Sequence, residues 1–125
     1  MSAGKRALVV DDNEVNRLLA GRLLTKAGWH VEMAEDGAQA LAWMARNCAD
    51  LVLLDISMPG LSGEDVCRTV RAEHLCQGGK LVAYTAHAMP DERQQFLACG
   101  FDAILTKPIS KATMLEMLVC VGLDQ

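Results

Sequence analysis

Short apolar runs alternate along this chain with longer segments in which apolar residues recur every three or four positions. The clearest run, 51–54, contains no polar residue and is followed by Asp55 and then by the turn-forming pair Pro59-Gly60. An unbroken run of this length predicts a strand buried on both faces, which a parallel sheet requires. Asp55 then ends a central strand, either as a group for chemistry or as an ordinary residue that caps the next turn.

The rest of the chain follows the same pattern of a strand and then a helix. The predicted strands are 7–10, 30–35, 51–54, 81–84 and 101–106, and the predicted helices are 14–27, 38–47, 64–73, 90–99 and 111–121. Strict alternation predicts an α/β fold whose parallel sheet carries helices on both faces. We expect a single flavodoxin-like (βα)5 domain with a five-stranded sheet in the order 2-1-3-4-5. That order leaves the segment 30–35, which alternates apolar and polar residues, at an edge.

Helical periodicity also predicts which apolar residues share a face. The first helix has Val15, Leu18, Leu19, Leu23 and Ala27 on one face, the second has Ala38, Leu41, Ala42 and Ala45 on its inner face, and the fourth turns Phe96 and Leu97 inward. Either Asp12 or Asn13 is expected to cap the first helix. A cap accounts for one acidic residue of the pair Asp11-Asp12 and leaves the other unexplained.

Composition narrows the class of protein. A chain of 125 residues is long enough for one domain with its own core. Its five cysteines are an odd, scattered set without a C-x-x-C pair, which indicates free thiols in a reducing compartment. Nucleic acid is excluded as a partner because the net charge is -4 and the sequence has no basic stripe. A membrane span is excluded because no apolar stretch is long enough. We therefore expect a soluble, cytoplasmic protein that contacts neither nucleic acid nor membrane.

Polar residues gather where the predicted strands end. Asp11 and Asp12 follow the first strand, Asp55 the third, Thr85 the fourth and Lys107 the fifth. Because parallel strands are joined by right-handed crossovers, these junctions share one edge of the sheet. Neighbouring strands are about 4.8 Å apart, so the three acids can share one ion, and the long stem of Lys107 can reach back to them.

Three carboxylates this close need a counter-charge, either a proton or a bound cation. Oxygen ligands in an open, partly hydrated site favour Mg²⁺ or Mn²⁺ over zinc. With one divalent cation and one ammonium group the formal charges cancel, and Thr85 and Lys107 are then suited to hold a phosphoryl group. Asp55 is the expected nucleophile, and its product is an aspartyl phosphate.

These strand-end residues and their neighbours resemble the receiver domain of two-component signalling, across essentially the whole chain. The residues that carry the resemblance are Asp11-Asp12, Asp55 with Met58-Pro59, Thr85-Ala86 and Lys107-Pro108. Within that family, 10–13 with Asn16, and 85–88, are most similar to receivers of hybrid sensor histidine kinases. We expect an N-terminal extension over 1–6, a receiver domain over 7–122 and a C-terminal tail over 123–125.

The resemblance implies a role for each acid. Asp55 accepts a phosphoryl group from a phosphohistidine, on a histidine kinase core or on a histidine phosphotransfer domain. Asp12, Asp55 and the backbone carbonyl of Ser57 ligate Mg²⁺ directly, and Asp11 acts through water. Such a module catalyses its own phosphorylation without turning over a separate substrate, although a parent hybrid kinase is an enzyme.

The resemblance also implies what surrounds the phosphoryl group. Thr85 and Lys107 hold its oxygens, Ala86 leaves room for it to enter, and the side chains of Ser57 and His87 flank it and tune hydrolysis.

Two positions near the fifth strand concern conformation. The Lys107-Pro108 bond is expected to be cis, as the family resemblance implies. Ile104 stands three residues before the lysine, where receivers usually carry an aromatic side chain that turns inward. We therefore expect conformational change to pass through the fourth helix and fifth strand by repacking alone.

Three alternatives remain open on the sequence. The chain could be a stand-alone single-domain response regulator instead of part of a hybrid kinase. An aspartyl-nucleophile phosphatase also uses an Asp at a strand end, but it needs a second Asp where Ser57 stands and usually has a cap domain. A flavodoxin-like binding protein lacks support, because the loops contain no Ser/Thr/Gly-rich phosphate cradle or flanking aromatics.

Overall fold

The structure is a computed structural model that describes residues 5–76, 79–86 and 88–123. Every predicted strand and helix is present, in the predicted order. The strands are β1 (Arg6–Val10), β2 (His30–Ala34), β3 (Leu51–Asp55), β4 (Lys80–Thr85) and β5 (Ala103–Thr106), and the helices are α1 (Glu14–Lys26), α2 (Gly37–Met44), α3 (Gly63–Ala72), α4 (Pro90–Cys99) and α5 (Lys111–Cys120). The largest differences are that α2 ends at Met44 and that β5 begins at Ala103.

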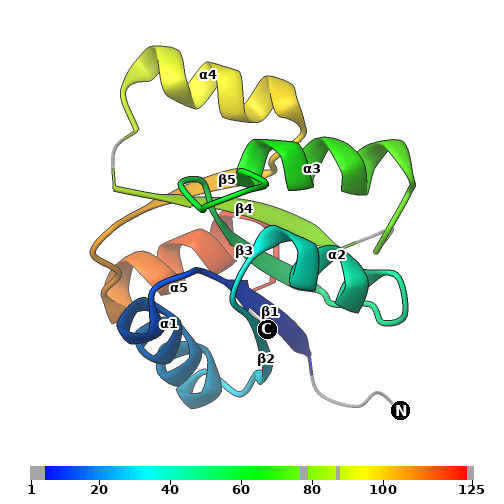
Figure 1. The fold of residues 1–125 in the computed structure, drawn as a ribbon. Helices are drawn as coiled ribbons and strands as arrows, with labels where there is room; N and C mark the ends of the chain where they lie inside the picture. The colour runs from blue at the N-terminus through cyan, green and yellow to red at the C-terminus, as the bar shows by residue number, and fades with distance from the viewer. Residues whose placement is uncertain (1–4, 77–78, 87, 124–125) are drawn as a thin grey trace.

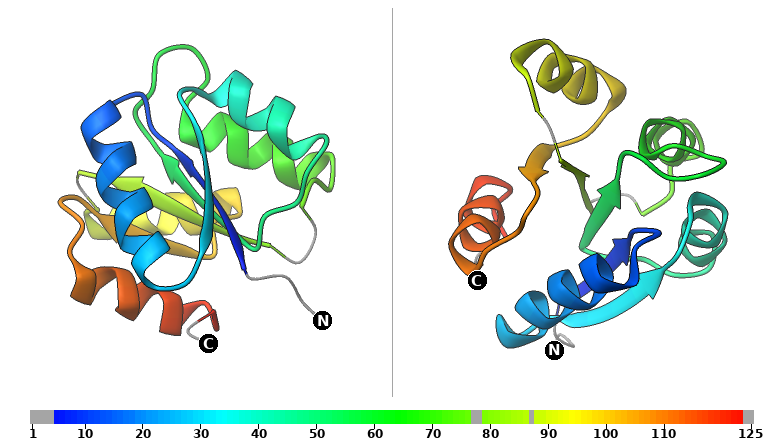
Figure 2. Two further views of the ribbon diagram at one scale, coloured as in Figure 1. Left: turned by 90° about the horizontal axis from the view of Figure 1, so that it is seen from below. Right: turned by 60° about the vertical axis from the view of Figure 1, so that its left-hand side comes forward.

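The strands form one parallel sheet in the order β2-β1-β3-β4-β5, which confirms the predicted topology. Helices α1 and α5 cover one face of the sheet, and α2, α3 and α4 cover the other (Figure 1; Figure 2). Strand β2 lies at an edge, and Ala34 is its one buried residue. The carboxyl ends of β1, β3, β4 and β5 therefore meet along one edge of the sheet.

Two apolar layers, one on each face of the sheet, hold the helices in place. Residues 51–54 of β3 are fully buried. Leu51 and Leu53 pack in the layer under α1 and α5, whereas Val52 and Leu54 pack in the layer under α2, α3 and α4. A strand covered on both faces needs apolar residues at every position, which explains why this run does not alternate. Each such side chain stabilises the fold by roughly 1.5–3 kcal/mol.

The predicted apolar face of α1 is largely wrong. Most of its residues are exposed, namely Val15 (71%), Leu18 (53%), Leu19 (39%) and Ala27. The buried residues of α1 are Ala20, Gly21 and Leu24. A Cβ atom on Gly21 would meet the end of the Met33 side chain, so small residues let this helix lie close to β2. Periodicity of large apolar residues cannot reveal a face that packs through small ones.

The inner faces of α2 and α4 also differ from the prediction. The residues that α2 buries are Gly37, Ala40 and Met44, whereas the predicted Ala38, Ala42 and Ala45 are exposed and Leu41 is half-buried. A Cβ on Gly37 would contact the side chains of Val66 and Leu61, so α2 approaches its neighbours closely at its first turn. In α4, Phe96 is buried as predicted, but Leu97 is exposed.

All five cysteines lie in the described ranges and are free thiols, as predicted. They are Cys48 and Cys120 (exposed), Cys67 and Cys76 (buried) and Cys99 (half-buried). Among the described residues, no helix has the length and apolar character needed to cross a membrane.

Candidate active site

Three carboxylates meet at the sheet edge where β1 and β3 end. Asp11 directly follows β1, and its N–H donates to the carbonyl of Ala34 in β2 at 3.2 Å, so the sheet still holds it. Asn13 caps α1, because its side-chain oxygen accepts from the N–H of Asn16 at 3.0 Å. The cap is therefore Asn13 and not Asp12. Ligand oxygens of Asp11, Asp12 and Asp55 all lie within 4.8 Å of one another.

Lys107 supplies the positive charge of the cluster. Its Nζ atom lies 3.1 Å from Oδ1 of Asp55 and 3.3 Å from Oδ2 of Asp11. The backbone N–H of Lys107 donates to the carbonyl of Thr85 at 2.7 Å, which fixes the start of its side chain beside β4. The prediction that an amine two strands away reaches the acids is confirmed, and the Lys107-Pro108 bond is cis, also as predicted.

The acid cluster carries more negative charge than Lys107 can offset, and two of its three acids are buried. Asp11 and Asp55 are buried, with 0% and 2% of their surface exposed, and Asp12 is exposed. Burial, and then repulsion from Asp11, raise the pKa of Asp55 from 3.8 to about 6, against the lowering effect of Lys107 and of the Ser57 N–H. One ammonium does not offset three carboxylates.

The donor set fits a divalent cation. Oδ2 of Asp11 is buried and accepts no hydrogen bond from the described residues, although a buried carboxylate oxygen normally has a donor. Its counter-charge is Lys107 Nζ. Carboxylate oxygens are the hard ligands that Mg²⁺ prefers. The site is open to solvent at Asp12, which suits an ion that keeps part of its hydration shell. A cation at this point would pair the unsatisfied oxygen and relieve the repulsion between the acids.

Ser57 and Thr85 come from two segments next to Asp55, the loop after β3 and the end of β4. The N–H of Ser57 donates to Oδ1 of Asp55 at 3.3 Å, while the Ser57 side chain is exposed. Thr85 is the last residue of β4 and is buried next to Tyr84, which is the register partner of Asp55. Ala86 follows and is exposed. The structure therefore brings the predicted hydroxyl to the neighbouring strand end.

Two of the remaining predicted positions lie in β5 or just after it. Ile104 is half-buried in β5 opposite Ala83 and packs against the core under α3 and α4. Pro108 is exposed after the cis bond. His87 lies outside the described residues, so its predicted flanking role stays a prediction.

Two site residues were not predicted, and each acts on a predicted one. Nζ of Lys107 lies 4.5 Å from the centre of the Tyr84 ring, a cation–π distance, and Tyr84 is buried. Burial, with the charges of Asp11 and Asp55, raises the pKa of Tyr84 to about 12. Arg17 donates to the backbone carbonyl of Asp11 at 2.7 Å. The signals in the sequence were an aromatic residue directly before Thr85 and a basic residue in the first turns of a helix.

Gly63 was also missed. A Cβ at this position would collide with the backbone of Asp55 and Ile56, so the first turn of α3 packs directly on the end of β3. The N–H of Gly63 donates to the carbonyl of Ile56 at 3.1 Å, and a Ser62–Asp65 capping box fixes the helix start. This contact holds the loop that carries Ser57 against the acid cluster.

Comparison with known proteins identifies a family that covers most of the chain. The family model of the response regulator receiver domain matches residues 7–119. The chain is 38% identical over 121 residues to sensor protein GacS of Pseudomonas syringae pv. syringae, covering 94% of this chain and 13% of that protein. The chain therefore spans a small part of this relative's length.

Solved structures show the same fold. Chemotaxis protein CheY4 of Vibrio cholerae superposes with a TM-score of 0.89 at 30% identity, over 95% of this chain and 99% of that one. The receiver domain of a sensor histidine kinase from Pseudomonas aeruginosa PAO1, solved with a magnesium ion coordinated in its active site cleft, gives 0.85 at 30% identity, over 96% and 99%.

A sheet in this order with an acid cluster at its carboxyl edge defines a CheY-like signalling fold. The chain belongs to the response regulator receiver domain family of two-component signalling. Its curated relatives include receivers of hybrid sensor histidine kinases.

Proposed function

We propose that this chain is the phosphoacceptor of a two-component phosphorelay and that Asp55 takes a phosphoryl group from a phosphohistidine with Mg²⁺ bound. The observation that carries the proposal is the convergence of Asp11, Asp12 and Asp55 within 4.8 Å, with Lys107 Nζ 3.1 Å from Asp55. An Asp at a strand end beside a hydroxyl and an ammonium group matches the needs of phosphoryl transfer.

The hydrogen bonds of Asp55 indicate which oxygen attacks. Both described bonds, from Lys107 Nζ and from the Ser57 N–H, fall on Oδ1. Oδ2 is then the nucleophile: the O–P bond forms as the P–N bond to histidine breaks, and a proton goes to the leaving imidazole nitrogen. Asp12, Asp55 and the Ser57 carbonyl would hold Mg²⁺ directly and Asp11 would hold it through water, and the cation would supply positive charge to the carboxylates and the phosphoryl oxygens.

Thr85 and Lys107 have distinct roles in this proposal. The ammonium group of Lys107 stays beside Asp55 and binds one oxygen of the phosphoryl group there. The hydroxyl of Thr85 donates to a second oxygen, and exposed Ala86 leaves the approach open. With a pKa of about 6, Asp55 is mostly ionised at neutral pH, and a bound cation would offset the burial and the repulsion from Asp11 that raise this pKa.

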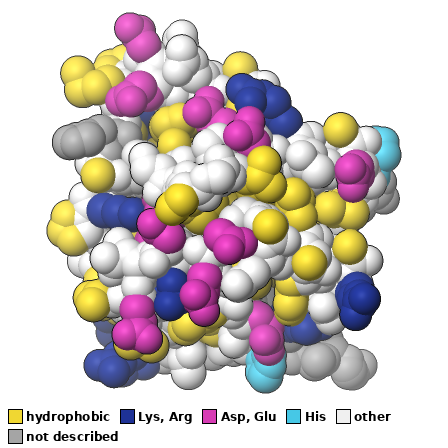
Figure 3. Space-filling model, viewed as in Figure 1, with side chains coloured by type: hydrophobic (Ala, Val, Ile, Leu, Met, Phe, Trp, Pro, Cys, Tyr) yellow, Lys and Arg dark blue, Asp and Glu magenta, His cyan; other side chains and the backbone are white. Residues whose placement is uncertain are grey.

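The exposed apolar face of α1 supports a helical protein partner that brings the phosphohistidine. Val15, Leu18 and Leu19 line a shallow groove with Arg22, and α1 begins two residues after Asp12. Exposed apolar patches of this kind mark protein interfaces. Figure 3 shows acidic side chains across the middle of the view, with Lys and Arg side chains next to some of them. The partner we propose is a histidine kinase core or a histidine phosphotransfer domain.

We also propose that the chain is a segment of a hybrid sensor histidine kinase that works in the cytoplasm. The curated relatives that support this origin are much longer, since the match to GacS covers 13% of that protein. Five free thiols fit a reducing compartment. A stand-alone single-domain regulator is the alternative.

The test is phosphorylation by acetyl phosphate with and without Mg²⁺, followed by intact-mass spectrometry. The wild type should gain the mass of one phosphoryl group only with the cation, Asp55→Asn should gain none, and Asp91→Asn, an exposed control in α4, should behave as the wild type. Phosphorylation of the Asp55→Asn variant would show that another residue is the acceptor. Steady release of phosphate over many turnovers would favour the phosphatase alternative.

A further inference from the structure

Two cysteines meet at the edge of the sheet opposite the acid cluster. Cys48 lies in the loop that leads into β3, and Cys76 in the loop that leads into β4. The Sγ atom of Cys76 donates to the carbonyl of Asn47 at 3.4 Å. The backbone N–H of Ala49 is near enough to the same sulfur to act against the rise in the pKa of Cys76. The Cys76 thiol is therefore held between the two residues that flank Cys48.

The two loops are packed closely at this point. A Cβ on Gly79 would collide with the carbonyl of Ala49, and the Gly79 N–H donates to the carbonyl of Cys76 at 2.9 Å. Cys76 itself has a φ of 48°, a left-handed conformation that is uncommon for a residue with a side chain. In this conformation the buried Cys76 thiol contacts the loop that carries the exposed Cys48.

The environment of the pair is asymmetric. Cys48 is exposed, whereas Cys76 is 6% exposed. Burial raises the pKa of the Cys76 thiol, and the neighbouring Cys48 thiol raises it further, against the lowering effect of the Ala49 N–H. A reagent in solution therefore meets Cys48 first, and Cys76 is the group within reach of whatever forms there.

We propose that Cys48 and Cys76 are a modification site at which a low-molecular-weight disulfide, such as oxidised glutathione, converts the thiol pair into a disulfide. The Cys48 thiolate attacks one sulfur of the reagent, forming a mixed disulfide and releasing one thiol. Cys76 then attacks Sγ of Cys48, forming the protein disulfide and releasing the second thiol. The two protons from the cysteines end on the released thiols, so two protein S–H bonds are oxidised and one reagent disulfide is reduced.

The disulfide would join the loops that precede β3 and β4, the strands that end in Asp55 and Thr85. Five residues of β3 separate these loops from the acid cluster, which is roughly 17 Å at 3.3 Å per residue. The disulfide would therefore link the amino-terminal ends of the two strands whose carboxyl ends carry Asp55 and Thr85. It does not rest on the proposed phosphoacceptor role.

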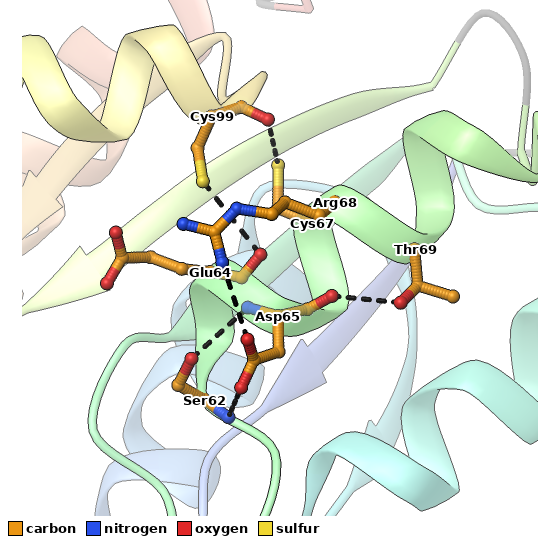
Figure 4. Close-up of polar contacts among 7 residues, drawn as sticks. All are labelled: Ser62, Glu64, Asp65, Cys67, Arg68, Thr69 and Cys99. Carbon is orange, nitrogen blue, oxygen red and sulfur yellow. Dashed lines mark hydrogen bonds and ion pairs between the residues drawn. The ribbon is translucent and has the colours of Figure 1, made fainter.

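The seam between α3 and α4 holds a second pair of cysteines, which serves as the matched control. Cys67 donates to the carbonyl of Cys99 at 3.5 Å, and Cys99 donates to the carbonyl of Glu64 at 3.9 Å. Each thiol points to a backbone carbonyl of the opposite helix (Figure 4). Cys67 is fully buried, and burial raises its pKa to about 11. We expect this pair to stay reduced.

The experiment treats the folded chain with oxidised glutathione, quenches free thiols with an alkylating reagent and maps the products by mass spectrometry. In the wild type the peptides of Cys48 and Cys76 should be joined and lighter by two hydrogen atoms, a glutathione adduct should be confined to the exposed Cys120, and Cys67 should be alkylated only after unfolding. Cys48→Ser should not form that disulfide, and Cys76→Ser should stop at the mixed disulfide. The midpoint of thermal unfolding should rise by roughly 10 °C on oxidation and return on reduction.

Mapping of the wild type decides the proposal even if Cys76→Ser does not fold. A stable glutathione adduct on Cys48 without the internal disulfide, or a disulfide that joins Cys67 to Cys99, would overturn it. Phosphorylation of Asp55 by acetyl phosphate should proceed in both redox states, so a failure of the thiol pair and a failure of the phosphoacceptor are seen separately.

Discussion

Replacing Asp55 with Asn should stabilise the folded chain when no divalent cation is present. The pKa of Asp55 is raised from 3.8 to about 6, mainly by burial and then by Asp11. A carboxylic acid with a raised folded pKa binds its proton more tightly in the folded state. Stability from this group is therefore greatest below about pH 4 and is lost as the pH rises through 6.

The size of the effect follows from that shift. About two pKa units at about 1.4 kcal/mol each give a cost of roughly 3 kcal/mol for the ionised Asp55 at neutral pH. Asn has nearly the same shape and no charge, and its Oδ1 can still accept from Lys107 and Ser57. We expect Asp55→Asn to raise the free energy of unfolding by roughly 1–3 kcal/mol near pH 7.5.

The assay is urea unfolding with a chelator at several pH values between about 5 and 7.5. The advantage of Asp55→Asn should shrink as the pH falls, because the wild-type carboxyl then takes up its proton. Saturating Mg²⁺ should stabilise the wild type and not the variant, which narrows or reverses the difference. The exposed Asp91→Asn is the control. A variant less stable than the wild type near pH 7.5, or a difference independent of pH, would refute the reasoning.

Two further substitutions test the supporting contacts. Gly63→Ala should lower the free energy of unfolding by roughly 1–3 kcal/mol, because its Cβ collides with backbone at Asp55. Urea unfolding measures this change, and an unchanged midpoint would show that the loop moves to make room for the methyl group. Tyr84→Leu should slow phosphorylation of Asp55 by roughly 3- to 10-fold, because Lys107 loses the ring beneath its ammonium. Tyr84→Phe keeps the ring and should retain the wild-type rate, and equal loss in both variants would assign the role to the hydroxyl instead.

The strands were predictable because burial on both faces requires an uninterrupted run of apolar residues. The run 51–54 is apolar at every position, and its position fixed Asp55 at the sheet edge. From there the parallel topology brought Asp11, Asp12 and Lys107 to the same place without any knowledge of side-chain geometry. The order of the strands was expected from the flavodoxin-like fold, and the alternation of the segment 30–35 agreed with its place at an edge.

The helix faces were less predictable because they depend on how closely two surfaces approach. Gly21 and Ala20 of α1 allow a close approach to the sheet, and this requirement leaves no pattern of large apolar residues. The outward position of Leu18 therefore came only from the structure. The Tyr84 ring under Lys107 and the Gly63 contact likewise depend on tertiary distances that no local pattern encodes.

The most direct test of the phosphoacceptor role is the position of the phosphoryl group itself. After treatment with acetyl phosphate and Mg²⁺, borohydride reduction and peptide mapping should place the modified residue at Asp55 in the wild type, with no modified peptide when a chelator replaces the cation. Modification at any other residue, or at Asp55 irrespective of the cation, would contradict the assignment of these three acids to one metal-dependent site.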